Sequence, residues 1–153
     1  MLLIGIKNTN AQTLISGENL DLGSVYRRCY RRNSCGTPSF YASGTALTIN
    51  AAGIYHVTAT MVCTATVAGI VSAELAANGV AIPGAISSET ITTAGTEQRT
   101  LVIDQYVLVD RACTLGTNAI RPVSLSIVNA GVGATFSAVT LNAEKVAERG
   151  RAR

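Results

Sequence analysis

The stretch GIYHVTATMVCTATV (residues 53–67) decides the fold. From Tyr55 onward apolar residues recur at every second position, and threonine or histidine fills most of the positions between them. Because alternate residues of a strand point to opposite faces, the pattern predicts a long antiparallel strand over residues 54–67 with one apolar and one wet face. Threonine suits such a strand, and Gly53 and Gly69 mark its two ends.

A second alternation follows and ends at Asn78-Gly79. This dipeptide accepts the positive φ angles of a tight hairpin turn, so the chain is expected to return in a short strand that Pro83-Gly84 closes. Turn-forming residues separate the remaining strand candidates. With the hairpin strands, these candidates cover residues 12–15, 24–30, 45–49, 71–78, 80–83, 86–92, 99–109, 123–128 and 135–143.

Many short strands joined by Gly-rich turns predict an all-β fold, a single-domain jelly-roll β-sandwich of eight to ten antiparallel strands. A chain of 153 residues suits one domain. We place the jelly-roll domain at residues 1–146 and a basic C-terminal tail at 147–153. Residues 143–149 have helix-favouring composition, but so short a helix is marginal in water, and a frayed tail is the alternative.

The composition favours an oligomer. Apolar residues make up 48% of the chain and charged residues 14%, against about 25% charged residues in ordinary soluble domains. The chain is therefore either a monomer with a Thr/Ser/Asn-rich surface or, as we expect, a subunit that buries its exterior against copies of itself. Every apolar run is shorter than the roughly 20 residues of a membrane helix, so no membrane span is expected.

The start of the chain, MLLIGIKNTN, lacks the basic region of a secretory signal. We expect a protein that is made and used without secretion, or one whose signal peptide has been removed. The net charge of +3 is modest and patchy. This balance predicts no specific nucleic-acid partner.

No residue pattern in the sequence predicts catalysis. His56 is the single histidine, and neither a Ser-Gly elbow nor a paired acid lies near it in sequence. The three aspartates are too widely spaced to predict an acid/base pair or a calcium loop, although calcium between subunits stays open. Phosphate-loop and dinucleotide motifs are absent. We therefore expect no enzyme activity, no cofactor and no metal.

The four cysteines are sparse for a disulfide scaffold. Cys29 and Cys35 are separated by five residues, a wider gap than zinc knuckles use. They form either a local disulfide or two free thiols. Cys63 and Cys113 are expected to act as small buried hydrophobes.

Arginines cluster in two places, Arg27-Arg28 with Arg31-Arg32, and a terminal group formed by Arg149, Arg151 and Arg153. Neighbouring guanidiniums repel each other unless acidic groups face them. The first cluster is either a charged edge strand that resists aggregation or a docking site. Its partner would then be an acidic face of a neighbouring subunit or of a capsid, or an anionic glycan, and the terminal arginines could join it.

Five segments in sequence order resemble the jelly-roll domains of complement component 1q and tumour necrosis factor. They are TALTINAAGIYHV (45–57), AELAANGVAIPG (73–84), LVIDQYVLVD (101–110), VSLSIVNAG (123–131) and ATFSAVTLNAEKV (134–146). The resemblance spans residues 12–146 and implies a homotrimer whose inner sheets meet at a threefold axis. Residues 135–143 carry apolar side chains on both faces and need cover on both sides, which makes Phe136, Val139 and Leu141 candidates for the trimer interface.

Ala/Thr/Val-rich, aromatic-poor versions of this domain are similar to bacteriophage head-fibre or capsid-decoration proteins and to spore-surface proteins. The chain lacks a collagen repeat and has no Trp, so a cytokine role is not expected. The resemblance implies a structural virion protein that is assembled in the bacterial host cytoplasm. Its partners would be itself and a capsid or other surface-layer protein. The alternative is an adhesion module on an extracellular or spore surface that binds a glycan or receptor.

Overall fold

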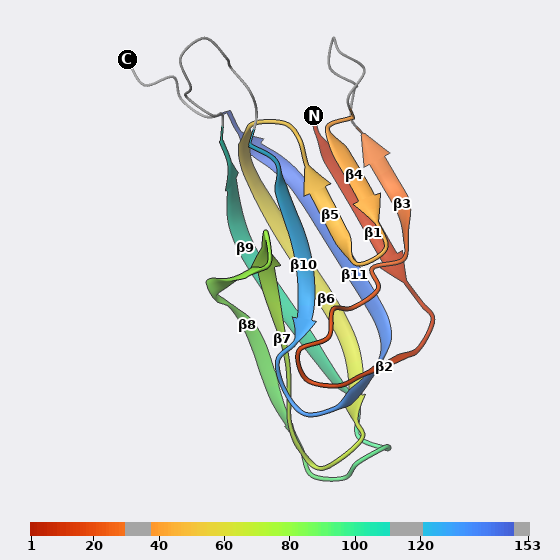
Figure 1. Cartoon of the computed structure of the whole chain (residues 1–153). Helices are drawn as coiled ribbons and strands as arrows, with labels where there is room; N and C mark the ends of the chain where they lie inside the picture. Colours follow the sequence, from red (N-terminus) through yellow and green to blue (C-terminus); the bar gives the residue numbers. More distant parts are fainter. Residues whose placement is uncertain (30–37, 111–120, 149–153) are drawn as a thin grey trace.

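The computed structural model describes residues 1–29, 38–110 and 121–148. These residues form two antiparallel β-sheets that pack face to face, and they contain no helix that could span a membrane (Figure 1). The predicted all-β jelly-roll sandwich is confirmed, although the described residues hold eleven strands rather than eight to ten. The strands are β1 (Leu3–Asn8), β2 (Gln12–Leu14), β3 (Ser24–Cys29), β4 (Phe40–Ser43), β5 (Ala46–Ile49), β6 (Gly53–Ala65), β7 (Gly69–Ala77), β8 (Val80–Ile91), β9 (Arg99–Val109), β10 (Val123–Asn129) and β11 (Ala134–Ala147).

Each sheet combines strands from distant parts of the chain. Sheet A has the order β3-β1-β11-β6-β9, with β2 pairing to β11, and sheet B has the order β4-β5-β10-β7-β8. β1 begins and β11 ends at the same end of the sandwich, which we call the terminal end (Figure 1). The β6–β7, β8–β9 and β10–β11 connections lie at the opposite end, the distal end.

Strand β6 shows how the alternation builds the core. Tyr55 and the odd-numbered residues that follow it through Ala65 are buried, as predicted. The Tyr55 ring meets Phe40 of sheet B edge to face at a centroid distance of 5.8 Å. Its hydroxyl donates a 2.7 Å hydrogen bond to the Ala51 carbonyl, as a buried tyrosine requires. Burial, and secondarily the Glu148 carboxylate, raises the pKa of Tyr55 above its ordinary value.

The predicted Asn-Gly hairpin is confirmed between β7 and β8, with φ angles of 52° at Asn78 and 79° at Gly79. The predicted strand end at Pro83-Gly84 is wrong, because β8 continues without interruption to Ile91. Gly84 has a φ of 80°, and the pairing of β8 with β7 shifts register nearby. This glycine therefore accommodates a β-bulge rather than a turn.

Two strands and one extension were not predicted. β1 pairs with β11, and β4 pairs with β5. The helix-favouring segment after Ala143 continues β11 as a strand through Ala147. The pairing between β11 and β6 also continues to Ala147, so this tertiary contact outweighs the helix-favouring composition of the segment. The remainder of the predicted tail from residue 149 lies outside the described residues.

We predicted a trimer interface at Phe136, Val139 and Leu141. The structure corrects this prediction, because these side chains are buried within one chain. All three point into the core between the two sheets and are at most 1% exposed. A β-bulge between Phe136 and Ala138 inserts an extra residue, so that Phe136 and Val139 share a face although they are an odd number of residues apart. The outward positions of β11 carry mostly polar side chains such as Thr140.

Candidate self-association and docking surfaces

The outer face of sheet A carries exposed apolar side chains on its edge strand β9. Val102, Tyr106 and Leu108 alternate with the buried residues of this strand and are 52%, 65% and 52% exposed. β9 therefore carries large apolar side chains on both of its faces. The criterion that pointed to residues 135–143, apolar side chains on both faces, applies here as well, and the sequence analysis did not apply it to this strand.

The His56 and Asp104 side chains contact each other on the same face, with 2.5 Å between His56 Nε2 and Asp104 Oδ1. The Tyr106 ring lies beside the imidazole at a centroid distance of 5.2 Å. In the part of the chain that the structure describes, no serine or cysteine hydrogen-bonds to His56, and no three acidic, His or Cys side chains group closely enough to hold a metal ion. The pair is thus a polar contact on a sheet surface.

The opposite edge of sheet A is held by Tyr26 of β3. Its hydroxyl donates a 2.7 Å hydrogen bond to Asn142 Oδ1. A Cβ atom on Gly5 would lie 2.8 Å from the Tyr26 ring, so the ring crosses β1 where that strand has no side chain. Lys7 Nζ lies 5.3 Å from the ring centroid, within the range of a cation–π contact. Tyr26 therefore fastens the short edge strand to the sheet.

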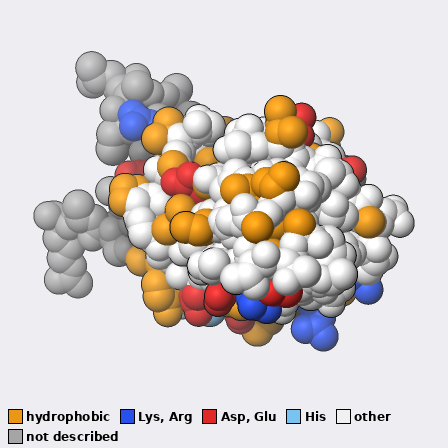
Figure 2. Space-filling view, turned by 90° about the horizontal axis from the view of Figure 1, so that it is seen from below, with side chains coloured by type: hydrophobic (Ala, Val, Ile, Leu, Met, Phe, Trp, Pro, Cys, Tyr) orange, Lys and Arg blue, Asp and Glu red, His pale blue; other side chains and the backbone are white. Residues whose placement is uncertain are grey.

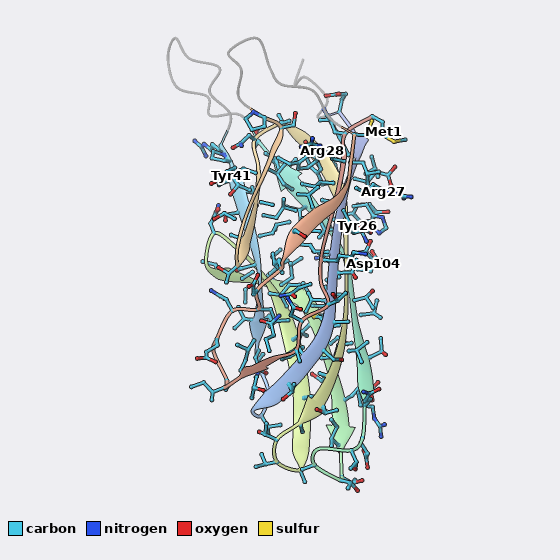
Figure 3. The ribbon with its side chains drawn as sticks, turned by 90° about the vertical axis from the view of Figure 1, so that its right-hand side faces the viewer. Met1, Tyr26, Arg27, Arg28, Tyr41 and Asp104 are labelled. Carbon is cyan, nitrogen blue, oxygen red and sulfur yellow. The ribbon has the colours of Figure 1, made fainter. Side chains whose placement is uncertain are left out.

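Arg27 and Arg28 follow Tyr26 on β3 and are both exposed. Arg27 lies opposite Gly5 in register and belongs to the outer face, whereas Arg28 lies opposite Ile4, whose side chain is in the core. Neither guanidinium forms an ion pair within the described ranges. Figure 3 shows Arg27 on the side of the sandwich that also carries Asp104. The other predicted docking residues lie outside the described residues: Arg31, Arg32, Arg149, Arg151 and Arg153.

The described cysteines differ in exposure. Cys29 is an exposed thiol at the end of β3, and Cys35 lies outside the described residues, so their pairing stays a prediction. Cys63 is buried in the core as expected, and burial raises the pKa of its thiol to about 11. It therefore stays protonated at neutral pH and acts as a small hydrophobe. Cys113 lies outside the described residues.

The distal end has an apolar surface. Ile15, Val67 and Ile70 are 68%, 56% and 55% exposed there. Val132 of the β10–β11 connection packs directly over Gly69, where a Cβ atom would clash with it. Figure 2, which views the molecule from this end, shows apolar side chains in the middle of an otherwise mostly uncharged surface. Arg28 at the terminal end pairs with no described residue, whereas Arg99 at the distal end pairs with Glu97, so the two ends differ in chemistry.

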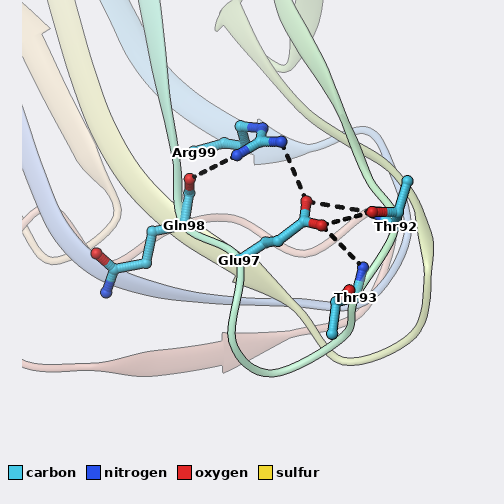
Figure 4. Close-up of polar contacts among 5 residues, drawn as sticks. All are labelled: Thr92, Thr93, Glu97, Gln98 and Arg99. Carbon is cyan, nitrogen blue, oxygen red and sulfur yellow. Dashed lines mark hydrogen bonds and ion pairs between the residues drawn. The ribbon is translucent and has the colours of Figure 1, made fainter.

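One polar cluster closes the β8–β9 connection at the distal end (Figure 4). The Glu97 carboxylate accepts hydrogen bonds from the Thr92 hydroxyl and from the backbone N–H groups of Thr92 and Thr93. It also pairs with Arg99 at 3.1 Å. The Thr92 hydroxyl is the main reason that the pKa of Glu97 is below its ordinary value, and the backbone bonds and Arg99 add to this effect. The cluster stabilises the connection between the two sheets.

Comparison with solved structures supports the same architecture. The globular domain of zebrafish complement 1qA protein matches with a TM-score of 0.63 at 6% sequence identity, over 97% of this chain and 100% of that chain. Eiger TNF from S. frugiperda matches with a TM-score of 0.65 at 11% identity, over 100% and 98%. PRD1 vertex protein P5 matches with a TM-score of 0.54 at 14% identity, over 95% and 96%. No protein-family model and no curated protein sequence matches the chain. The chain thus has the jelly-roll fold that these complement, TNF-like and vertex proteins share.

Proposed function

We propose that this chain is a structural virion protein, a homotrimeric capsid decoration or head-fibre module without catalysis. The observation that carries self-association is the outer face of sheet A, where Val102, Tyr106 and Leu108 are each more than half exposed along one strand. Large apolar side chains gathered on one face are typical of a surface that another chain covers. A second copy of the chain would supply that cover.

The proposed trimer and the proposed location in a virion both rest on the resemblance to other jelly-roll proteins. The C1q and TNF jelly-roll families suggest the trimer, and PRD1 vertex protein P5 provides a protein of the same fold that is named for its place in a virion. Assembly in the bacterial host cytoplasm belongs to the same proposal. An extracellular or spore surface is the alternative location.

Docking to the capsid is proposed for the terminal end. Arg28 is exposed there and forms no ion pair among the described residues. Guanidinium groups form strong bidentate pairs with carboxylates, so an acidic face of a capsid protein suits this end. The arginines outside the described residues would extend the same surface.

Co-sedimentation with capsids that lack this protein tests the docking. Wild-type protein should bind in multiples of three set by the capsid symmetry. Arg28→Gln should weaken binding about three- to tenfold, because it removes one charge-assisted contact. Arg99→Gln at the distal end removes the same charge and should bind as wild type. Wild-type protein that does not sediment with capsids would contradict the decoration role.

Adhesion is the second candidate, and the apolar distal end favours it. Ile15, Val67 and Ile70 would be presented away from a surface to which the terminal end is docked. On this proposal, Val67→Ser and Ile70→Ser abolish attachment to host cells without changing capsid binding, and Ile86→Ser on sheet B changes neither. Attachment that survives both distal substitutions rules out this end as the receptor-binding surface.

A further inference from the structure

Asp104 and Arg27 lie at the two ends of one row across the outer face of sheet A. Asp104 of β9 is the register partner of Thr58 of β6, which is the partner of Asn142 of β11. Asn142 is the partner of Gly5 of β1, and Gly5 is the partner of Arg27 of β3. The carboxylate and the guanidinium are thus at the same level along the strands but at opposite edges of the sheet.

The two edges have complementary chemistry. The β9 edge presents the Asp104 carboxylate, which is 61% exposed despite its contact with His56, beside the exposed Tyr106 ring. The β3 edge presents Arg27, and Lys7 lies over the ring of Tyr26 next to it. One edge is therefore acidic with an aromatic side chain, and the other is basic with an aromatic side chain (Figure 3).

Within one chain these two charges cannot meet. Five strands place four interstrand spacings of about 4.8 Å between the edges, about 19 Å in total. If a second copy covers this face, both charges lose water, and an unpaired buried charge is strongly destabilising. A covered face therefore requires a counter-charge for Arg27, which pairs with no described residue, and the Asp104 carboxylate, still 61% exposed beside His56, has the charge to supply it.

We propose that copies of this chain associate head to tail, with the β9 edge of one copy against the β3 edge of the next and Asp104 paired with Arg27 of that neighbour. This inference rests on the proposed self-association through sheet A. A contact between two different edges is heterologous, and repetition around an axis closes it into a ring. In a trimer each copy uses both edges once, so every Asp104 and every Arg27 is paired.

The next row fits the same arrangement. Tyr106 of β9 and His56 of β6 are register partners, and His56 is also the partner of Glu144 of β11. This row continues through Leu3 of β1 to Cys29 of β3. The contact that joins Asp104 to Arg27 therefore also brings Tyr106 of one copy beside Leu3 and Cys29 of the next, so that apolar surface is buried next to the ion pair.

Charge reversal and its rescue test the pairing. Native mass spectrometry and sedimentation velocity would compare wild type with Asp104→Arg, with Arg27→Glu and with the double variant. Each single variant places like charges at every contact and should assemble at least about tenfold more weakly. The double variant restores opposite charges at every contact and should assemble within about threefold of wild type. Glu74→Arg, on the outer face of sheet B, is the matched control and should assemble as wild type.

The outcomes separate this inference from the proposal on which it rests. Wild-type protein that is monomeric at micromolar concentration would overturn the proposed self-association itself. Wild-type protein that assembles while the single variants assemble equally well would overturn the pairing and leave self-association standing. Single variants that dissociate and are not rescued by the double variant would also overturn the pairing, provided that circular dichroism shows them to be folded. Weakening by both single variants with rescue by the double variant confirms it.

Discussion

The outer faces of the two sheets differ, although their inner faces are built in the same way. On sheet B the central outward positions carry small or polar side chains, and Ser72 and Ser88 hydrogen-bond to each other at 2.8 Å. The edge strands of sheet B also expose large apolar side chains, such as Tyr41 on β4 and Ile86 on β8, whereas the edge strand β9 of sheet A exposes Val102, Tyr106 and Leu108 along one strand. The inner alternation therefore specifies the sandwich, and the proposed self-association assigns the contacts with a partner to the outward positions of sheet A.

The largest expected effect is on stability, and it distinguishes the inner face of β11 from its outer face. Phe136→Ala should lower the free energy of unfolding by about 3–5 kcal/mol, because it removes a fully buried ring. Thr140→Ala, on the outward side of the same strand, should change it by less than about 0.5 kcal/mol. Denaturant unfolding monitored by circular dichroism measures both values. Equal effects would mean that Phe136 does not pack in the core.

The second effect separates the two outer faces. Tyr106→Arg on sheet A should weaken self-association by at least about 30-fold, since a buried aromatic side chain at an interface commonly contributes 2 kcal/mol or more. Tyr41→Arg on sheet B, at a similarly exposed tyrosine, should leave it unchanged. Sedimentation velocity over a concentration series gives both association constants. Loss of assembly in the Tyr41 variant instead would assign the self-association surface to sheet B.

A smaller effect is expected where β3 is fastened to sheet A. Gly5→Ala places a methyl group against Tyr26 and Asn142 and should cost about 1–3 kcal/mol of stability. That cost corresponds to a fall in Tm of about 2–4 °C per kcal/mol. Tyr26→Phe keeps the ring and loses one exposed hydrogen bond, so its Tm should fall less. A Gly5 variant as stable as wild type would show that Tyr26 is not held across β1.

The smallest effect concerns the connection between the two sheets and depends on pH. The hydrogen bonds to Glu97 lower its pKa in the folded state, so its stabilising contribution is present above the unfolded pKa and is lost as the pH falls through the lowered value. The Tm difference between wild type and Glu97→Gln should therefore shrink on acidification. Glu89→Gln, exposed on β8, is the control and should show no such trend. A difference that stays constant with pH would show that the carboxylate is not the stabilising group.

Local sequence patterns correctly predicted those strands and turns whose conformation is determined by residues close together in the sequence. The strict alternation of β6 and β9 gave strands close to the observed bounds, and Asn78-Gly79 gave the hairpin. β1 and β4 escaped prediction because short strands are fixed by the strands they pair with, β3 and β11 for β1 and β5 for β4, rather than by their own alternation. Gly84 was misinterpreted because a glycine in a bulge and a glycine in a turn look alike in sequence.

The candidate site was less predictable, since it depends on register. The bulge after Phe136 reversed the faces of β11, so three core residues were taken for an interface. The row from Asp104 to Arg27 runs through four strand pairings that no local pattern encodes. Arg27, at one end of this row, belongs to the arginine cluster noted in the sequence, whose docking role stays a prediction. The two-sided apolar character of β9 was present in the sequence as well, but it was assigned to the wrong strand.

The native mass of the wild-type protein at micromolar concentration tests the central claim most directly. Self-association through sheet A predicts a species of three chain masses, measured by native mass spectrometry and by light scattering coupled to size-exclusion chromatography. A single chain mass under these conditions would contradict it.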